Sequence, residues 1–220
     1  MTNIKGAIFD VDGTLLDSMQ MWDNVAADYL KSRGVTPRSN LNEELRTLGG
    51  HQISGYFRSE YGLPESEDEI RVGIEKLLQA FYFDSKIVKL KDGVVEVLEK
   101  LQMRGIKMCV ATATDRWLIE PALRNCGIDQ YFGRIFTCGE EETSKNHPDI
   151  YISAAEFLGT DIEDTLVFED ALYAIKSAKR AGFPVVGIYD SVAEGHQDEI
   201  ERLCDIYLKS MASGGLRNFL

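Results

Sequence analysis

Three carboxylates follow directly on an apolar segment near the start of the chain. The segment IFDVDGTLLD, residues 8–17, runs from two large apolar residues into Asp10, Asp12 and Asp17. Carboxylates at the end of a buried strand can act as nucleophiles, as general acids and bases, or as oxygen ligands of a hard cation. This segment is therefore the first candidate for a site that does chemistry.

Residues of the same kind stand at the ends of later apolar runs. Thr112 follows one run, and Glu169 and Asp170 follow another. In open α/β sheets, ligands bind beyond the carboxyl ends of the strands. If the strands concerned are neighbours, these three residues lie in one pocket with Asp10 and Asp12.

Four carboxylates in one pocket need a counter-charge. One pair of like charges at 4 Å costs about 4 kcal/mol at an effective dielectric constant of 20. A hard divalent cation bound by oxygen ligands offsets this repulsion, and a shell with few carboxylates and several waters suits Mg²⁺ best. The sequence therefore predicts a Mg²⁺ site built from Asp10, Asp12, Glu169 and Asp170.

Short apolar runs alternate with helical patterns over most of the chain, and such runs are typical of strands covered on both faces. After the first run, they cover residues 106–111, 134–137, 165–168, 183–189 and 205–208. Helical patterns cover residues 94–101, 150–158 and 171–181. Pro121 favours a further helix that begins near Glu120 over one that runs unbroken from Asp115. This alternation predicts a parallel, doubly wound α/β sheet.

Residues 18 to about 85 break this alternation. They contain no clear strand but four helical stretches, at residues 19–33, 41–48, 53–61 and 67–83. A helical insert between the first two strands, joined by two connections, would form a small separate domain. We therefore expect an α/β core domain at residues 1–16 plus 87–220 and an all-α cap domain at residues 17–86.

The composition limits the classes of partner. A formal net charge of −12 argues against nucleic acid, whose binding needs clustered Lys and Arg, but not against a small anionic ligand in a locally positive pocket. No apolar run reaches the ~18 residues of a membrane span, and the first residues show no signal-peptide pattern. The four cysteines form no C-x-x-C pair, which is typical of free thiols in a reducing cytoplasm.

Four motifs, taken in order, resemble those of the haloacid dehalogenase-like superfamily: Asp10-Val11-Asp12-Gly13-Thr14, Thr112, Lys145 and Glu169-Asp170. The segments FDVDGTLLDS, SKNHPDIY and FEDALYAIKSAKRAG further resemble its β-phosphoglucomutase-like phosphatases, which carry a small helical cap. One D-x-D-G-T alone would be weak evidence, whereas all four motifs in order are specific.

This resemblance implies a role for each motif. Asp10 would attack phosphorus and form an aspartyl-phosphate, and Asp12 would protonate the leaving oxygen and then activate water. Thr112, the Ala113 N–H and Lys145 would bind phosphate oxygens.

The resemblance also implies a metal shell and a class of substrate. The implied Mg²⁺ ligands are Asp10, the backbone carbonyl of Asp12, Asp170, and Glu169 directly or through water. The implied reaction is hydrolysis of a small phosphorylated metabolite beneath a closing cap. Residues expected to set specificity are Trp22, Arg46, Gln52, Tyr56 and Arg116.

Two alternatives stay open. By loose alignment, sugar-phosphate mutases carry His, Arg and Lys where this chain has Trp22, Gln52 and Asp115-Arg116, which disfavours a mutase. A non-catalytic phosphate-binding module would be signalled by loss of the nucleophile, the acid or the metal ligands, and all of these are present. The sequence does not predict an oligomeric state.

Overall fold

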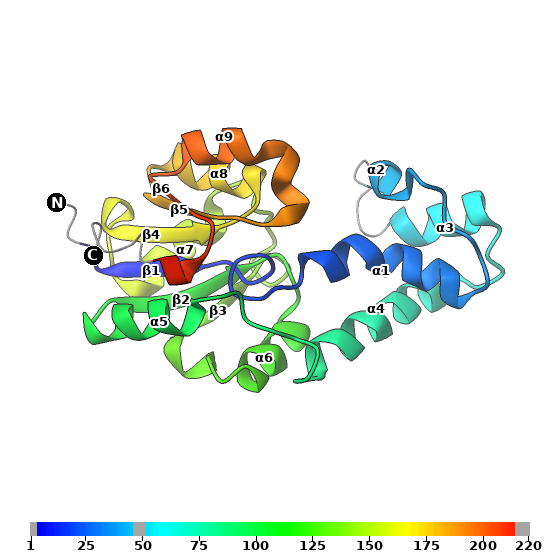
Figure 1. Ribbon diagram of the computed structural model, residues 1–220, viewed down its shortest axis with the longest axis horizontal. Coiled ribbons are helices and arrows are strands. Elements are labelled where there is room, and N and C mark those ends of the chain that lie inside the picture. Colours follow the sequence, from blue (N-terminus) through cyan, green and yellow to red (C-terminus); the bar gives the residue numbers. More distant parts are fainter. Residues whose placement is uncertain (1–3, 46–51, 214–220) are drawn as a thin grey trace.

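The computed structural model describes residues 4–45 and 52–213. They form an α/β body around a parallel sheet and a helical body that projects from it (Figure 1). In this part of the chain, no helix combines the length and the apolar character that a membrane span needs.

The sheet has the strand order β3-β2-β1-β4-β5-β6, and every neighbouring pair is parallel. Its strands are β1 (Gly6–Phe9), β2 (Lys107–Thr112), β3 (Ile135–Thr137), β4 (Thr165–Glu169), β5 (Val185–Ile188) and β6 (Ile206–Leu208). The central strand β1 pairs on one side with β2, where Phe9 faces Val110, and on the other with β4, where Phe9 faces Phe168. The predicted doubly wound α/β class is confirmed.

Helices cover both faces of this sheet (Figure 1). They are α5 (Val94–Met103), α6 (Arg116–Asn125), α7 (Asp149–Leu158), α8 (Leu172–Ala181) and α9 (Gln197–Leu203), with short 3₁₀ turns at Asp129–Tyr131, Ile162–Asp164, Ser191–His196 and Met211–Ser213. Successive strand residues point to opposite faces. Phe9 therefore packs in the cluster on the α5 and α6 side, and Ile8 packs in the cluster on the α7 and α8 side.

The helical body has an apolar cluster of its own. Its helices are α1 (Met19–Ser32), α2 (Leu41–Leu45), α3 (Ile53–Tyr61) and α4 (Glu67–Phe83). Tyr29, Leu30 and Phe57 lie at the centre of that cluster, and a capping box between Ser66 and Glu69 begins α4. These contacts agree with the expected helical insert, and its exact boundaries stay a prediction.

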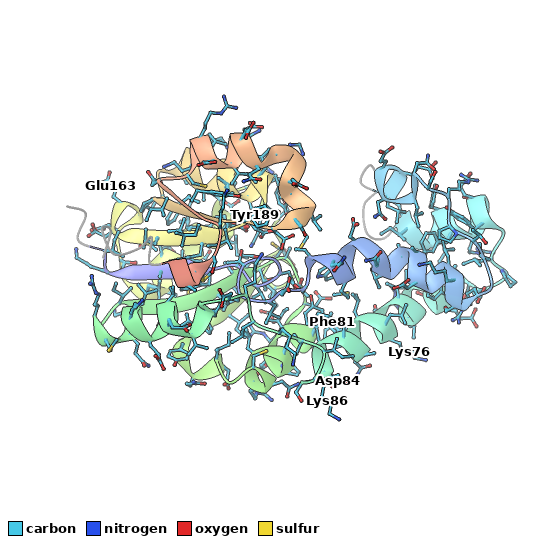
Figure 2. The ribbon with its side chains drawn as sticks, viewed as in Figure 1. Lys76, Phe81, Asp84, Lys86, Glu163 and Tyr189 are labelled. Atoms are coloured by element: carbon cyan, nitrogen blue, oxygen red, sulfur yellow. The ribbon has the colours of Figure 1, made fainter. Side chains whose placement is uncertain are left out.

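Two connections and one helix contact join the helical body to the sheet. The connections run antiparallel, with the Asp17 N–H donating to the Lys89 carbonyl and the Lys91 N–H donating to the Leu15 carbonyl, each at 2.9 Å. The end of α4 also packs against α6, where the Phe83 ring meets the Trp117 ring edge-on. Figure 2 follows α4 from Lys76 in the helical body through Phe81 to Asp84 beside the core.

One helix begins earlier than the sequence led us to expect. α6 starts at Arg116 and contains Pro121, so the expected start near Glu120 was wrong. Proline removes one helical hydrogen bond, here the bond to the Trp117 carbonyl. The helix nevertheless continues, because buried residues on both sides of the proline pack on the core: Leu118, Ile119, Ala122 and Leu123.

The glycines at the two ends of α5 give a matched pair for a stability test. Gly93 has φ +83°, and a Cβ there would lie 2.0 Å from the Ala212 nitrogen, whereas Gly105 has φ +69° and open space around it. We expect Gly105→Ala to lower the free energy of unfolding by about 1 kcal/mol through its backbone conformation alone. Gly93→Ala should cost about 2 kcal/mol more, because the backbone at Ala212 must also move. Equal losses in urea unfolding would contradict the close packing at Gly93.

Candidate active site

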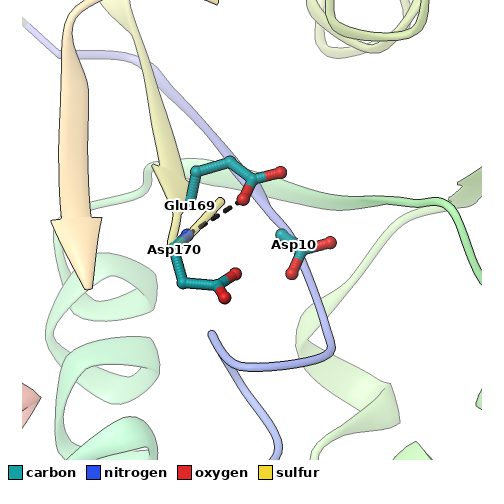
Figure 3. A group of neighbouring side chains, drawn as sticks. All are labelled: Asp10, Glu169 and Asp170. Atoms are coloured by element: carbon teal, nitrogen blue, oxygen red, sulfur yellow. Dashed lines mark hydrogen bonds between the residues drawn. The ribbon is translucent and has the colours of Figure 1, made fainter. Parts of the chain in front are cut away.

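The carboxyl ends of three adjacent strands bring the predicted residues together. Asp10 follows β1, Thr112 ends β2, and Glu169 ends β4. The Asp10 N–H donates to the Phe168 carbonyl at 3.0 Å, which holds the end of β1 beside β4. Figure 3 shows the Asp10, Glu169 and Asp170 carboxylates gathered at this edge of the sheet.

The turn after β1 fixes the position of Asp170. Gly13 has φ +85°, and a Cβ there would lie 2.4 Å from Asp170 Oδ2. The neighbouring Thr14 hydroxyl, which is fully buried, donates to Asp170 Oδ1 at 3.2 Å. Glycine and threonine thus follow the two aspartates because the turn passes directly against a third carboxylate.

Lys145 brings a positive charge into the cluster from the loop between β3 and α7. Its ammonium donates to Asp10 Oδ1 and, at 2.6 Å, to Glu169 Oε1. The residue is 3% exposed. Burial alone would lower the pKa of Lys145, but the charges of Asp10 and Glu169 outweigh it and hold the pKa well above its ordinary value. The ammonium therefore stays charged.

Glu169 accepts hydrogen bonds at both of its oxygens. Oε1 accepts from Lys145 and from the Tyr151 hydroxyl at 3.0 Å, and Oε2 accepts from the N–H groups of Asp170 and Ala171 at 2.9 and 3.1 Å. This carboxylate is consequently fixed in place and in turn fixes Lys145.

The three clustered carboxylates fit a divalent cation. Asp10, Glu169 and Asp170 each offer an oxygen, and these oxygens lie within 4.8 Å of one another. Burial raises the pKa of Asp10 to about 7, although the positive charge of Lys145 opposes this rise. Burial is also the largest cause for Asp170, and together with the negative charges of Glu169 and Asp10 it raises the pKa of Asp170 well above its ordinary value. Raised pKa values mean that burial and neighbouring negative charges penalise the ionised carboxylates, and a bound cation would offset this penalty.

Asp12 points into the same region and is held by three hydroxyl groups. Its Oδ1 accepts from Ser18 at 2.6 Å and from Tyr82, and its Oδ2 accepts from Thr114 at 2.7 Å. Burial, followed by the charge of Asp12, raises the pKa of Tyr82 above its ordinary value, so this hydroxyl keeps its proton. The sequence patterns did not predict Tyr82, Thr114 or Tyr151 as residues of this site.

A cavity of about 360 Å³ opens onto these groups between the sheet edge and α1. Its lining consists of Asp10, Asp12, Met19, Trp22, Thr112, Ala113, Thr114, Glu169, Asp170, Ala171 and Tyr173. Thr112 Oγ1 accepts from the Thr114 N–H at 3.1 Å, so the Thr112 hydroxyl can donate its hydrogen to a ligand in this cavity.

The residues expected to set specificity are spread more widely. Trp22 lines the cavity, whereas Tyr56 donates to Glu44 within the helical body, and Gln52 stands just before α3. Arg116 donates to Glu140 and, at 2.7 Å, to the Ile135 carbonyl. Arg46 lies outside the described residues. The specificity roles of these residues stay predictions.

Comparison with known proteins gives one family and several relatives. A model of the family "Haloacid dehalogenase-like hydrolase" matches residues 7–188. "Protein CbbY" of Rhodobacter capsulatus is 29% identical, covering 83% of this chain and 84% of that protein. "Hexitol phosphatase B" of Escherichia coli K12 is 26% identical, covering 94% and 93%. A mutant CbbY from Rhodobacter sphaeroides, solved with xylulose-(1,5)bisphosphate, shares the fold with a TM-score of 0.77, 23% identity and 96% coverage of both chains.

The raised pKa of Asp10 predicts how the stability of the metal-free protein depends on pH. The folded pKa of about 7 lies above the ordinary 3.8, so between these values the folded state holds a proton that the unfolded state releases. The free energy of unfolding should therefore fall as the pH rises through this window, by at most about 1.4 kcal/mol per pH unit. Mg²⁺ held by these carboxylates would require their ionised form, so the rise in Tm on adding Mg²⁺ should be larger at pH 8 than at pH 6.

Thermal unfolding at both pH values, with Mg²⁺ and with chelator, tests this prediction. Asp10→Asn is the control, because it should lack the contribution of Asp10 to both trends. A rise in Tm on adding Mg²⁺ that is equal at the two pH values would contradict the assignment of Asp10 to the metal site.

Proposed function

Because the chain belongs to the haloacid dehalogenase-like hydrolase family and is an enzyme of the phosphatase type, we propose that it hydrolyses a small phosphomonoester with Mg²⁺ through an aspartyl-phosphate on Asp10. One observation carries this proposal above all: Asp10, bound to the buried Lys145 ammonium, and Asp12, held by three hydroxyls, line the same cavity. A nucleophile and a general acid that face one space are what two-step phosphoryl transfer needs.

In the first step, an Asp10 carboxylate oxygen attacks phosphorus. The new bond joins Asp10 to the phosphoryl group, and the bond between phosphorus and the ester oxygen breaks. Asp12, protonated at this stage, gives its proton to the departing alcohol. Lys145 supports this step by holding Asp10 in place and by placing a positive charge beside the phosphoryl oxygens.

In the second step, water attacks phosphorus from the side that the alcohol has left. Asp12 is now ionised and takes a proton from this water, the Asp10–phosphorus bond breaks, and inorganic phosphate is released. The Thr112 hydroxyl and the Ala113 N–H would bind phosphoryl oxygens in both steps, since both residues line the cavity.

We assign the Mg²⁺ ligands to Asp10, Asp170 and the backbone carbonyl of Asp12. Glu169 would contact the ion through water, because its oxygens already accept four hydrogen bonds. When bound, the ion would neutralise charge on the phosphoryl oxygens.

The size of the cavity and the nature of the relatives support a small phosphorylated metabolite as substrate. About 360 Å³ accommodates a phosphate ester of a sugar or polyol but no folded protein segment. Hexitol phosphatase B is a relative whose name states such a substrate. We further propose that the enzyme works in the cytoplasm, an assignment that the four free thiols support.

Product analysis separates the hydrolase from the alternatives. A panel of sugar phosphates, polyol phosphates, nucleotides and p-nitrophenyl phosphate is incubated with Mg²⁺ or with chelator. A hydrolase releases inorganic phosphate only with Mg²⁺, a mutase forms an isomeric sugar phosphate, and a binding module does neither.

Asp10→Asn should abolish this phosphate release, because the amide cannot attack phosphorus, and it should still fold, because Glu169 remains as the buried partner of Lys145. Asp17→Asn is the matched control: it changes an exposed aspartate of the same segment and should keep the activity. Steady-state turnover by folded Asp10→Asn would exclude the covalent mechanism.

Asp170→Ala should raise the Mg²⁺ concentration needed for half-maximal activity by at least about tenfold, because the ion loses a carboxylate ligand. Asp164→Ala removes an aspartate at the opposite end of β4, where it pairs with Lys5, and should leave the Mg²⁺ titration unchanged. Identical titrations of Asp170→Ala and the unmodified enzyme would refute the metal assignment.

A further inference from the structure

The Asp12 carboxylate is held by donors from three separate parts of the chain. Ser18 lies in the connection that enters the helical body, Thr114 follows β2, and Tyr82 lies in the last turn of α4. Tyr82 is thus the donor that the helical body itself supplies. It is 0% exposed, so no water competes for its hydroxyl.

A second bond determines which way the Tyr82 hydroxyl points. The Trp22 Nε1–H donates to the Tyr82 oxygen at 2.8 Å. An indole N–H can only donate, so the Tyr82 oxygen must accept, and its single hydrogen is left for Asp12. Trp22 in α1 and Tyr82 in α4 therefore form a directed chain of hydrogen bonds that ends on Asp12.

These hydrogen bonds affect the proposed reaction because they end on Asp12, the proposed general acid. A general acid must lie within hydrogen-bond reach of the leaving oxygen, and a displacement of about 1 Å can cost about 10²-fold in rate. Two donors on Oδ1 and one on Oδ2 fix the plane of the carboxylate. Without the Tyr82 hydroxyl, Oδ1 keeps only the hydrogen bond from Ser18, which is six residues further along the chain.

We propose that Tyr82 is a positioning residue of this enzyme: its hydroxyl, directed by the Trp22 indole, holds Asp12 in the orientation that proton transfer to the leaving group requires. This inference rests on the proposed function, in which Asp12 is the general acid. It assigns to Tyr82, and to the polar end of Trp22, a role in the reaction that is distinct from packing and from substrate contact.

Leaving-group dependence distinguishes this role from packing. An alkyl alcohol needs a proton as it departs, whereas p-nitrophenolate leaves without one. Tyr82→Phe removes only the hydroxyl and should lower kcat/KM for the best alkyl phosphate of the panel by about 10- to 100-fold. The same variant should lower kcat/KM for p-nitrophenyl phosphate by less than about threefold, because kcat/KM reports the first transfer step.

Tyr29→Phe is the matched control. Tyr29 is also a buried tyrosine of the helical body, 1% exposed, but it stands two turns along α1 from Trp22 and lines a separate hollow between α1 and α4. Removal of the Tyr29 hydroxyl should leave kcat/KM unchanged for both substrates. Trp22→Phe removes the N–H that directs Tyr82 and should likewise lower kcat/KM selectively for the alkyl ester. This variant tests the proposal if Tyr82→Phe does not fold.

Two results overturn the inference: an equal loss on both substrates in Tyr82→Phe, which would mean general disruption of the cap, or no loss on either. A failure of the proposed function looks different. The unmodified enzyme would then release no phosphate from any ester of the panel, or Asp12→Asn would keep full activity on the alkyl ester.

Discussion

The structure depends on one interaction: the buried ammonium of Lys145 between the carboxylates of Asp10 and Glu169. Breaking a buried pair by removing one partner costs several kcal/mol, since an uncompensated charge is left behind. The fold therefore has to bring these groups from distant parts of the chain to one point. Parallel pairing of β1 with β4 places Asp10 beside Glu169, and the loop between β3 and α7 brings Lys145 to both. The Tyr151 hydroxyl and two backbone N–H groups complete the shell of Glu169.

The helical body contacts this cluster of charged side chains at Asp12, which accepts a hydrogen bond from Tyr82. The two connecting strands of chain run beside each other, and α4 continues along α6. Tyr82, near the end of α4, is buried in the same apolar cluster as the sheet residues Phe9 and Val110 rather than in the cluster of the helical body. The end of α4 is thus packed in the core, and from this buried position the Tyr82 hydroxyl reaches the Asp12 carboxylate.

Sequence patterns predicted the parts of this architecture that local chemistry determines. Continuous apolar runs indicated the strands, and polar residues at their ends indicated the edge where Asp10, Thr112 and Glu169 meet. Contacts between side chains far apart in sequence carry no such local signal, which is why Tyr82, Tyr151 and Thr114 were missed. Pro121 was misread for a related reason. A local rule places proline at a helix start, but here packing on both sides of the proline decides where the helix begins.

The balance of charge in the cavity would give the proposed metal a role before any chemistry occurs. Four carboxyl groups, Asp10, Asp12, Glu169 and Asp170, surround one ammonium, so when they are ionised and no cation is bound, a phosphate ester would enter a region of its own sign. Lys145 cannot offset this alone, because it is already shared between Asp10 and Glu169. A divalent ion bound at this site would reverse this repulsion and would at the same time lower the pKa of Asp10, the proposed nucleophile. Under the proposed function, substrate binding and activation of the nucleophile would therefore depend on the same bound ion, and that coupling would follow from burying so many carboxyl groups around a single lysine.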